Sequence, residues 1–377
     1  MIKFWSYNRE LKKYKNKIYS KIKKSLNSGK IFFGNELLEF EKNFIKKNKS
    51  KYGVAVGSGT DALFIALKSL GIKNGDEVIT AANTAIPTIS AIRSVGAIPK
   101  LVDIGDDYLI DSFKIVREIT KKTKAIIPVH LYGQTCNMDE IIKISKKYKL
   151  KIIEDCAQSQ GAKYKKRFCG TIGDVGCFSF YPTKILGAYG DGGFVLTNDY
   201  NLYKKIKRIR FYGIETIDKK NKYINKYYSN EDGINSRLDE IQAGILNFKL
   251  SIIEKLILRR RHLAQLYFKE LSLTNLKLPP ISKNSDHVFH LFTVYHPQRN
   301  KIIKELMNLS IETKIIYPYP IHKMNAYKKF FKNNKRLKNS ELKSKGIFCL
   351  PIYPELTNYE ALKICKSIKK IIKKISL

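Results

Sequence analysis

The chain has 377 residues, enough for two domains with substantial cores, and its apolar share of 44% is typical of a globular rather than a disordered protein. No run of about 18 uncharged apolar residues occurs, and the opening MIKFWSYNRELKKYK contains no apolar segment of the signal-peptide type, so we expect a cytoplasmic protein with no membrane partner. The formal net charge is +38, but only 12 of the 71 basic residues are arginine and the lysines are spread along the chain, so we interpret most of them as solvated surface and expect no nucleic-acid partner.

The six cysteines are scattered along the chain, mostly inside apolar runs, and none of them forms a CxxC pair. Zinc sites and redox motifs use such closely spaced pairs. We therefore expect buried free thiols and no metal site.

In the first two hundred residues, apolar runs alternate with segments of helical spacing. The lysine-rich segment 10–30 is predicted to be a surface helix, and ELLEFEKNFIKK is predicted to be a second one. The strands predicted next are KYGVAV, EVITAA, IPKLVDI, KAIIPVHL and LKIIEDCA, with helices between them over 61–70, 86–95, 112–120 and 138–148. GDVGCFSFY and GGFVLTND predict two more strands. Such alternation is typical of a parallel sheet with helices on both faces.

The second part of the chain has a different pattern. Residues 215–232 are polar and poorly periodic, which predicts a loop, and a long helix is predicted from Ser236 to residue 271. FHLFTVYH then predicts a strand, and helices are predicted near 300–308 and 355–374. We therefore divide the chain into a large domain, residues 1–245, and a smaller C-terminal α/β domain, residues 246–377.

The first candidate site element is the turn Gly57–Thr60, where a predicted strand ends in GSGT and a helix begins. The unpaired N–H groups at a helix N-terminus bind phosphate, and glycine lets the ligand approach closely. An ordinary glycine turn would have the same sequence, and a Walker loop is not matched because no lysine follows at the required place.

Two further candidates follow predicted strands. Asp155 ends an apolar strand, with Gln158 shortly after it, and ligands of parallel sheets bind beyond the carboxyl ends of the strands; the aspartate could instead cap a following helix. Lys184 follows the strand CFSFY, and a lysine with a lowered pKa is a nucleophile toward carbonyls. Pyridoxal phosphate needs this combination: donors for its phosphate, a carboxylate for its pyridine nitrogen and an amine for its aldehyde.

With these residues in place, the chain resembles the DegT/DnrJ/EryC1/StrS family of sugar aminotransferases. The resemblance is carried, in order, by GSGT, GDEVIT, PVHLYGQ, IIEDCAQS, GDVGCFSFYPTK, GDGGFVLTND, NSRLDEIQAGIL and YPYPIH, over nearly the whole chain. It implies a type I aminotransferase fold, with a mostly parallel mixed sheet in the large domain, and a homodimer with active sites at the subunit interface. It also implies pyridoxal 5'-phosphate, with pyridoxamine 5'-phosphate as intermediate, and amino transfer from glutamate to a keto group on a nucleotide-linked sugar.

The resemblance implies a role for each residue near the cofactor ring. Lys184 would form a Schiff base with the cofactor and later move a proton between cofactor and substrate. Asp155 would pair with the pyridinium nitrogen. Gln158 would hydrogen-bond the ring hydroxyl.

The resemblance also implies a phosphate site. Gly59, Thr60 and the hydroxyl of Ser179 would hold the phosphate from one subunit. Asn235, in NSRLDEIQ, would reach the phosphate of the neighbouring subunit, although it could also be the N-cap of the long helix.

Beyond the cofactor, Tyr317 and His322 match the family's segment that lines the sugar-nucleotide pocket, although His322 could equally be a hydrogen-bonded core histidine. The family often places an aromatic residue, stacked on the pyridine ring, where Ala85 stands here. We expect a neighbouring residue to cover the ring by apolar contact instead.

For the reaction, we favour transfer to a dTDP-linked 3-keto-6-deoxyhexose for amino-sugar and surface-glycan synthesis, because FWSYNRE and ANTAIPT resemble that branch of the family. The alternatives are an aminotransferase for a 4-keto nucleotide sugar and a sugar dehydratase of the same family, in which histidine replaces the Schiff-base lysine. A non-catalytic nucleic-acid-binding protein on the same scaffold is the alternative from another class.

Overall fold

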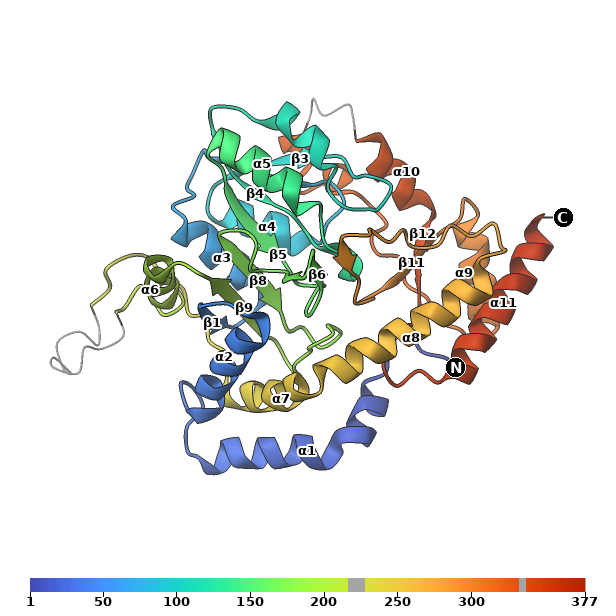
Figure 1. Cartoon of the computed structure of the whole chain (residues 1–377), viewed down its shortest axis with the longest axis horizontal. Helices are drawn as coiled ribbons and strands as arrows, with labels where there is room; N and C mark the ends of the chain where they lie inside the picture. The colour runs from blue at the N-terminus through green and yellow to red at the C-terminus, as the bar shows by residue number, and fades with distance from the viewer. Residues whose placement is uncertain (216–227, 332–336, 377) are drawn as a thin grey trace.

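The computed structural model describes residues 1–215, 228–331 and 337–376, and a seven-stranded sheet lies at the centre of its larger part (Figure 1). The strand order is β1-β9-β8-β5-β4-β2-β3, and among these seven strands β9 runs antiparallel to the rest. The strands are β1 (Tyr52–Val56), β2 (Glu77–Ala81), β3 (Ile98–Val102), β4 (Thr123–Ile127), β5 (Lys151–Asp155), β8 (Val175–Ser179) and β9 (Gly193–Thr197). The expected mostly parallel mixed sheet is therefore confirmed.

Helices cover both faces of this sheet, because alternate residues of each strand point to opposite sides. In β1, Val54 and Val56 join one buried cluster, whereas Ala55 joins another. The first cluster includes residues of α3 and α4, and the second includes residues of α2. The helices around the sheet are α2 (Asn35–Asn48), α3 (Gly59–Ser69), α4 (Ile86–Ser94), α5 (Met138–Tyr148) and α6 (Tyr200–Ile209).

The long helix predicted from Ser236 is two helices in the structure, α7 (Glu240–Ser251) and α8 (Ile253–Leu271). They are separated at Ile252, whose φ of −113° and ψ of 7° are not helical. α1 (Tyr7–Asn27) packs along α7, and α8 leads from there into the second part of the molecule (Figure 1). The prediction of one continuous helix was therefore wrong, although both segments are helical.

The second part of the molecule is a small α/β unit with its own core. β11 (Phe292–Tyr295) pairs antiparallel with β12 (Ile347–Leu350). Its helices are α8, α9 (Arg299–Asn308), α10 (Lys338–Gly346) and α11 (Asn358–Ser376). Shorter elements are the strands β6 (Lys163–Tyr164), β7 (Arg167–Phe168) and β10 (Ser285–Asp286) and the 3₁₀ turns η1 (Ser112–Glu118), η2 (Leu131–Gly133), η3 (Ile321–Lys323) and η4 (Lys328–Phe330).

The first residues of the chain pack against this C-terminal unit. The N–H of Ile2 donates to the carbonyl of Ser310 at 2.7 Å, and the N–H of Glu312 donates to the carbonyl of Ile2 at 2.9 Å. The N–H of Phe4 donates to the Glu312 carboxylate at 3.0 Å. The first residues of the chain therefore pair with the C-terminal unit, although the proposed division assigns them to the large domain. The division at residue 245 stays a prediction.

Three smaller expectations concern the loop, the cysteines and the membrane. Of the loop predicted over 215–232, residues 216–227 lie outside the described residues. All six cysteines are free and buried. Within the described ranges, no helix has both the length and the apolar character needed to cross a membrane.

Candidate active site

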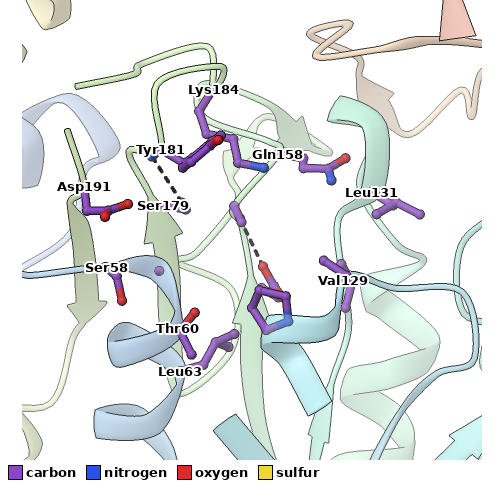
Figure 2. Close-up of a pocket in the computed structure, with 15 residues that line it drawn as sticks. Ser58, Thr60, Leu63, Val129, Leu131, Gln158, Ser179, Tyr181, Lys184 and Asp191 are labelled. Atoms are coloured by element: carbon purple, nitrogen blue, oxygen red, sulfur yellow. Dashed lines mark hydrogen bonds between the residues drawn. The ribbon is translucent and has the colours of Figure 1, made fainter. Parts of the chain in front are cut away.

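A cavity of about 250 Å³ lies at the carboxyl edge of the sheet. β1, β5 and β8 run parallel, so the residues that follow them meet at this edge. In Figure 2 the Lys184 side chain extends into the cavity toward Gln158, while Ser58 and Thr60 lie at its opposite end. The predicted residues that line this cavity are Gly59, Thr60, Asp155, Gln158, Ser179 and Lys184.

One end of the cavity is the N-terminus of α3. The Ser58 hydroxyl caps this helix by accepting a hydrogen bond from the Asp61 N–H at 3.1 Å. The N–H groups of Gly59 and Thr60, in the first turn, have no partner within the helix and form the positive end of its dipole. A Cβ on Gly59 would lie 2.5 Å from the Ser179 Cβ, so only glycine lets the helix start pack against the end of β8. Free N–H groups at a helix N-terminus are donors of the kind that bind phosphate, so this end of the cavity is the candidate phosphate site.

Asp155 is held at the end of β5 by two hydrogen bonds. Its carboxylate accepts from the Ala157 N–H at 3.1 Å and from the Thr88 hydroxyl at 2.9 Å. The side chain is buried, and burial raises the pKa of Asp155, while both hydrogen bonds and the charge of Lys184 oppose that rise. No helix follows Asp155 directly in the chain, so the alternative role as a helix cap is wrong. Sequence reasoning missed Thr88, because nothing in the helical segment 86–94 marks one hydroxyl as a carboxylate partner.

A second buried acid supports this strand end from the other side. Glu154 accepts hydrogen bonds from three backbone N–H groups between residues 170 and 173 at 2.7–2.9 Å, and it lies 3.0 Å from Nε2 of His130. The Cys136 N–H donates to Nδ1 of His130, so the imidazole proton sits on Nε2 and is donated to Glu154. Cys156 lies close enough to complete a group of three metal-type ligands. Since the oxygens of Glu154 are already occupied by these donors, the cluster orders the backbone around Asp155.

Gln158 connects the cavity to the C-terminal unit. Its side-chain oxygen accepts from the Tyr132 N–H at 2.8 Å, and its amide donates to the hydroxyl of Tyr317 at 3.0 Å. The Tyr132 hydroxyl in turn donates to the carbonyl of Ile316 at 2.7 Å. Tyr317, predicted from the YPYPIH segment, is therefore brought to the site by a direct contact with Gln158.

Lys184 lies between this cavity and a second one of about 320 Å³, and both are lined by Gln158, Tyr181 and Lys184. Its own N–H donates to the carbonyl of Tyr181, which fixes the turn after β8. Burial lowers the pKa of the Lys184 amine to about 8, against the opposing pull of Asp155. About a tenth of the amine is thus unprotonated at pH 7, a far larger share than in an ordinary lysine, and the neutral form is the nucleophile toward a carbonyl.

The second cavity has walls from both ends of the chain. Phe4 and Trp5, from the N-terminal segment, line it together with residues of the C-terminal unit. The Trp5 ring meets Tyr7 edge-on, and Tyr7 meets Tyr189, which belongs to the glycine-rich turn after Lys184. The other lining residues include Thr183, Arg260, His290, Leu291, Lys314, Ile316, Tyr317 and Ile352. Sequence reasoning did not place Phe4 and Trp5 here, because their position depends on a pairing across the whole chain.

Two predicted residues lie outside both cavities. Asn235 is exposed and forms a backbone bridge with Phe211. The N-cap of α7 is Asp239, so the alternative role of Asn235 as that cap is wrong. His322 is buried and lies 2.9 Å from the Glu341 carboxylate through Nε2, which is how a hydrogen-bonded core histidine behaves.

Ala85 does line the first cavity, without an aromatic side chain. The apolar residues that line it as well are Leu63, Pro87, Val129, Leu131 and Ala157, and Tyr181 is the one aromatic lining residue among those described. These aliphatic side chains are available to cover a flat ring in this cavity, and the expectation that one of them does so stays a prediction.

Known proteins are similar in sequence to this chain over almost its full length. It is 38% identical over 374 residues to a dTDP-3-amino-3,4,6-trideoxy-alpha-D-glucose transaminase of Micromonospora megalomicea subsp. nigra, with 98% of each chain covered. It is 39% identical over 371 residues to a dTDP-3-amino-3,6-dideoxy-alpha-D-galactopyranose transaminase of Aneurinibacillus thermoaerophilus, covering 98% of this chain and 99% of that one.

Solved structures of similar proteins have the same fold as this chain. DesV of S. venezuelae, determined in complex with a ketimine intermediate, superposes with a TM-score of 0.93 at 34% identity, with 98% of each chain covered. NtdA of Bacillus subtilis, determined with bound cofactor PMP, superposes with a TM-score of 0.87 at 30% identity over 98% of this chain and 83% of that one. The expected aminotransferase fold is thereby confirmed. The model of the DegT/DnrJ/EryC1/StrS aminotransferase family matches residues 12–369, and the chain belongs to this family.

Proposed function

We propose that this enzyme is a pyridoxal-phosphate-dependent aminotransferase that moves the amino group of glutamate to a nucleotide-linked keto-6-deoxyhexose. The observation that carries the proposal is the position of Lys184, a half-buried amine with a lowered pKa between two cavities. A buried carboxylate and a helix N-terminus complete the first of these cavities. As acceptor we favour a dTDP-linked 3-keto sugar, because both relatives named above are dTDP-3-amino-sugar transaminases.

The residues of the first cavity fit the cofactor group by group. When bound, pyridoxal phosphate supplies an aldehyde that accepts the amino group and a pyridine ring that withdraws electrons from the bond being broken. The unpaired N–H groups of Gly59 and Thr60 and the Ser179 hydroxyl would hold its phosphate. Asp155 would hold a proton on the ring nitrogen, and the second amide hydrogen of Gln158 is available to the ring hydroxyl.

Lys184 would carry out both the covalent and the proton-moving steps. In its neutral form the amine would be the nucleophile toward the cofactor's aldehyde, and the same nitrogen, when not bound to the cofactor, would serve as the base. Because it faces both cavities, it can take a proton from a carbon of the substrate and return it on the cofactor side.

The assembly we propose is a homodimer. Asn235 is exposed and lines neither of the two cavities described above, which is compatible with a residue that serves the neighbouring subunit's phosphate site. Tyr317 would contact the sugar substrate from the second cavity. For His322, the same role requires the neighbouring segment to move, since its ring now hydrogen-bonds Glu341.

Borohydride trapping tests the proposal directly. Purified enzyme incubated with pyridoxal phosphate and reduced with borohydride should carry the cofactor on the peptide that contains Lys184, and Lys184→Ala should carry none. A panel of dTDP-, UDP- and GDP-linked 3-keto and 4-keto sugars with glutamate, followed by mass spectrometry, then identifies the acceptor. Trapping on another lysine would refute the assignment, and loss of a sugar hydroxyl without gain of nitrogen would indicate the dehydratase instead.

A further inference from the structure

The second cavity contains a buried cation that has no anionic partner. Arg260 of α8 is 3% exposed and lines this cavity. Its Nη1 donates to the carbonyls of Phe289, His290 and Ile352 at 3.3, 3.2 and 2.7 Å. Its Nε is buried without any hydrogen-bond partner, and no carboxylate in the described part of the chain pairs with the guanidinium.

The nearby acids do not neutralise this charge. Glu10 is paired with Lys249 at 2.6 Å, and Glu355 lies 3.7 Å from Lys13. Both act on Arg260 only at longer range, and burial still lowers the pKa of its guanidinium to about 10. A buried charge without an anionic partner is costly, and the carboxylate of a ligand in this cavity would offset that cost.

A second polar group without a partner lies beside it. His290 is 5% exposed and lines the same cavity, and its Nδ1 is buried without a hydrogen bond. Burial and the charges of Lys184 and Arg260 lower the pKa of His290, so the ring is neutral at physiological pH and can donate or accept one hydrogen bond to a ligand. Arg260 donates to the His290 carbonyl, and its charge also acts on the His290 ring, so the two residues line neighbouring parts of the cavity.

We propose that Arg260 and His290 form the carboxylate subsite for the amino donor, an inference that rests on the proposed aminotransferase function. Guanidinium groups bind carboxylates through charge-assisted and often paired hydrogen bonds. Lys184 lines the same cavity, so a donor held there by its carboxylate has its amino group within reach of the reacting centre. The diphosphate of a nucleotide sugar has similar oxyanion chemistry, but a cavity of about 320 Å³ holds an amino acid and not a whole nucleotide sugar. The subsite therefore belongs to the donor.

The test uses the cofactor-loaded enzyme and separates the two half-reactions. Glutamate alone, without sugar, is titrated while the cofactor's visible spectrum is recorded, and binding of maleate, a dicarboxylate that cannot react, is measured by calorimetry. Arg260→Gln should weaken both glutamate and maleate binding about 10- to 100-fold, the size of a lost hydrogen bond to a charged group. The reverse half-reaction, with the dTDP-amino sugar as donor, should change less than threefold. Arg260→Lys should recover part of the maleate affinity.

Arg261 provides the matched control. It is the next residue of the same helix, its Nε donates to the His287 carbonyl at 3.0 Å, and it lines neither cavity. Arg261→Gln should leave glutamate and maleate binding unchanged. If Arg260→Gln does not fold, the variants His290→Leu and His290→Gln are compared instead. Maleate binding should be weaker in the leucine variant and unchanged in the glutamine variant.

Three results would overturn the subsite. The first is a folded Arg260→Gln that binds glutamate and maleate like the wild type. The second is a loss of affinity for the amino sugar alone, which would assign the cation to the diphosphate. The third is an equal loss of both half-reactions, which would show a structural role. Failure of the proposed function looks different: the wild-type enzyme itself would then show no spectral change with glutamate.

Discussion

Replacing Lys184 by methionine in the cofactor-free protein should stabilise the fold at neutral pH. The amine has an ordinary pKa of 10.5 and a pKa of about 8 in the folded chain, because burial disfavours its charged form. A difference of that size corresponds to roughly 3 kcal/mol, and solvent in the open cavity screens part of it. We therefore expect Lys184→Met to raise the free energy of unfolding by about 2 kcal/mol at pH 7.

The pH dependence has a definite sign. Between pH 8 and 10.5 the unfolded wild-type chain binds more protons than the folded one, so its stability rises with pH in this window. The advantage of the methionine variant should accordingly be full below pH 8 and fade as the pH approaches 10.5. Other lysines titrate as well, but they are the same in both proteins and cancel in the difference.

Urea unfolding of the cofactor-free wild type and variant at pH 7, 8, 9 and 10 measures this difference. Lys143→Met, at an exposed position of α5, is the control and should show no comparable difference at any pH. The idea that the buried charge of Lys184 destabilises the folded protein would be refuted by either of two results. The methionine variant would be less stable than the wild type at pH 7, or its additional free energy of unfolding would not change with pH.

Three further substitutions test the surroundings of the cofactor cavity. Thr88→Val removes the hydroxyl that donates to Asp155, and kcat/KM should fall roughly tenfold or more, with Thr88→Ser restoring most of it; equal activity of both variants would contradict the role. Gly59→Ala places a Cβ 2.5 Å from the Ser179 Cβ, so the dissociation constant of the cofactor should rise, as measured by equilibrium dialysis; unchanged affinity would show that the helix start can shift at no cost. Glu154→Gln leaves a backbone N–H or the buried histidine without its acceptor and should lower the free energy of unfolding by roughly 3 kcal/mol in urea; a loss of activity without a loss of stability would argue against a structural role.

Much of the larger unit could be predicted from the sequence, because its signals are local. Apolar runs of five or six residues became the strands of the central sheet, and the helical segment 138–148 is helical over the predicted residues. The strand order could not be predicted from the sequence, because it depends on which strands pair across long stretches of the chain. The break at Ile252 was missed because the apolar pattern continues through it without a glycine or proline.

The candidate site was predictable where chemistry and chain position coincide. Asp155 and Lys184 each follow a strand, and parallel strands bring such residues to one edge. The roles of Thr88 and Arg260 could not be predicted, because the sequence around a threonine or an arginine in a helix does not indicate which groups the side chain will contact. Their roles depend on packing between segments that lie far apart in the sequence.

The pairing of Ile2 with the strand-like segment at Ile311 has a practical consequence for anyone who expresses this protein. A shortened version that begins at Ser6 would lose Phe4 and Trp5, and with them one wall of the second cavity, while every residue of the cofactor cavity would remain. Such a preparation would still bind the cofactor and show its visible absorbance. Its turnover of substrate, however, would be low.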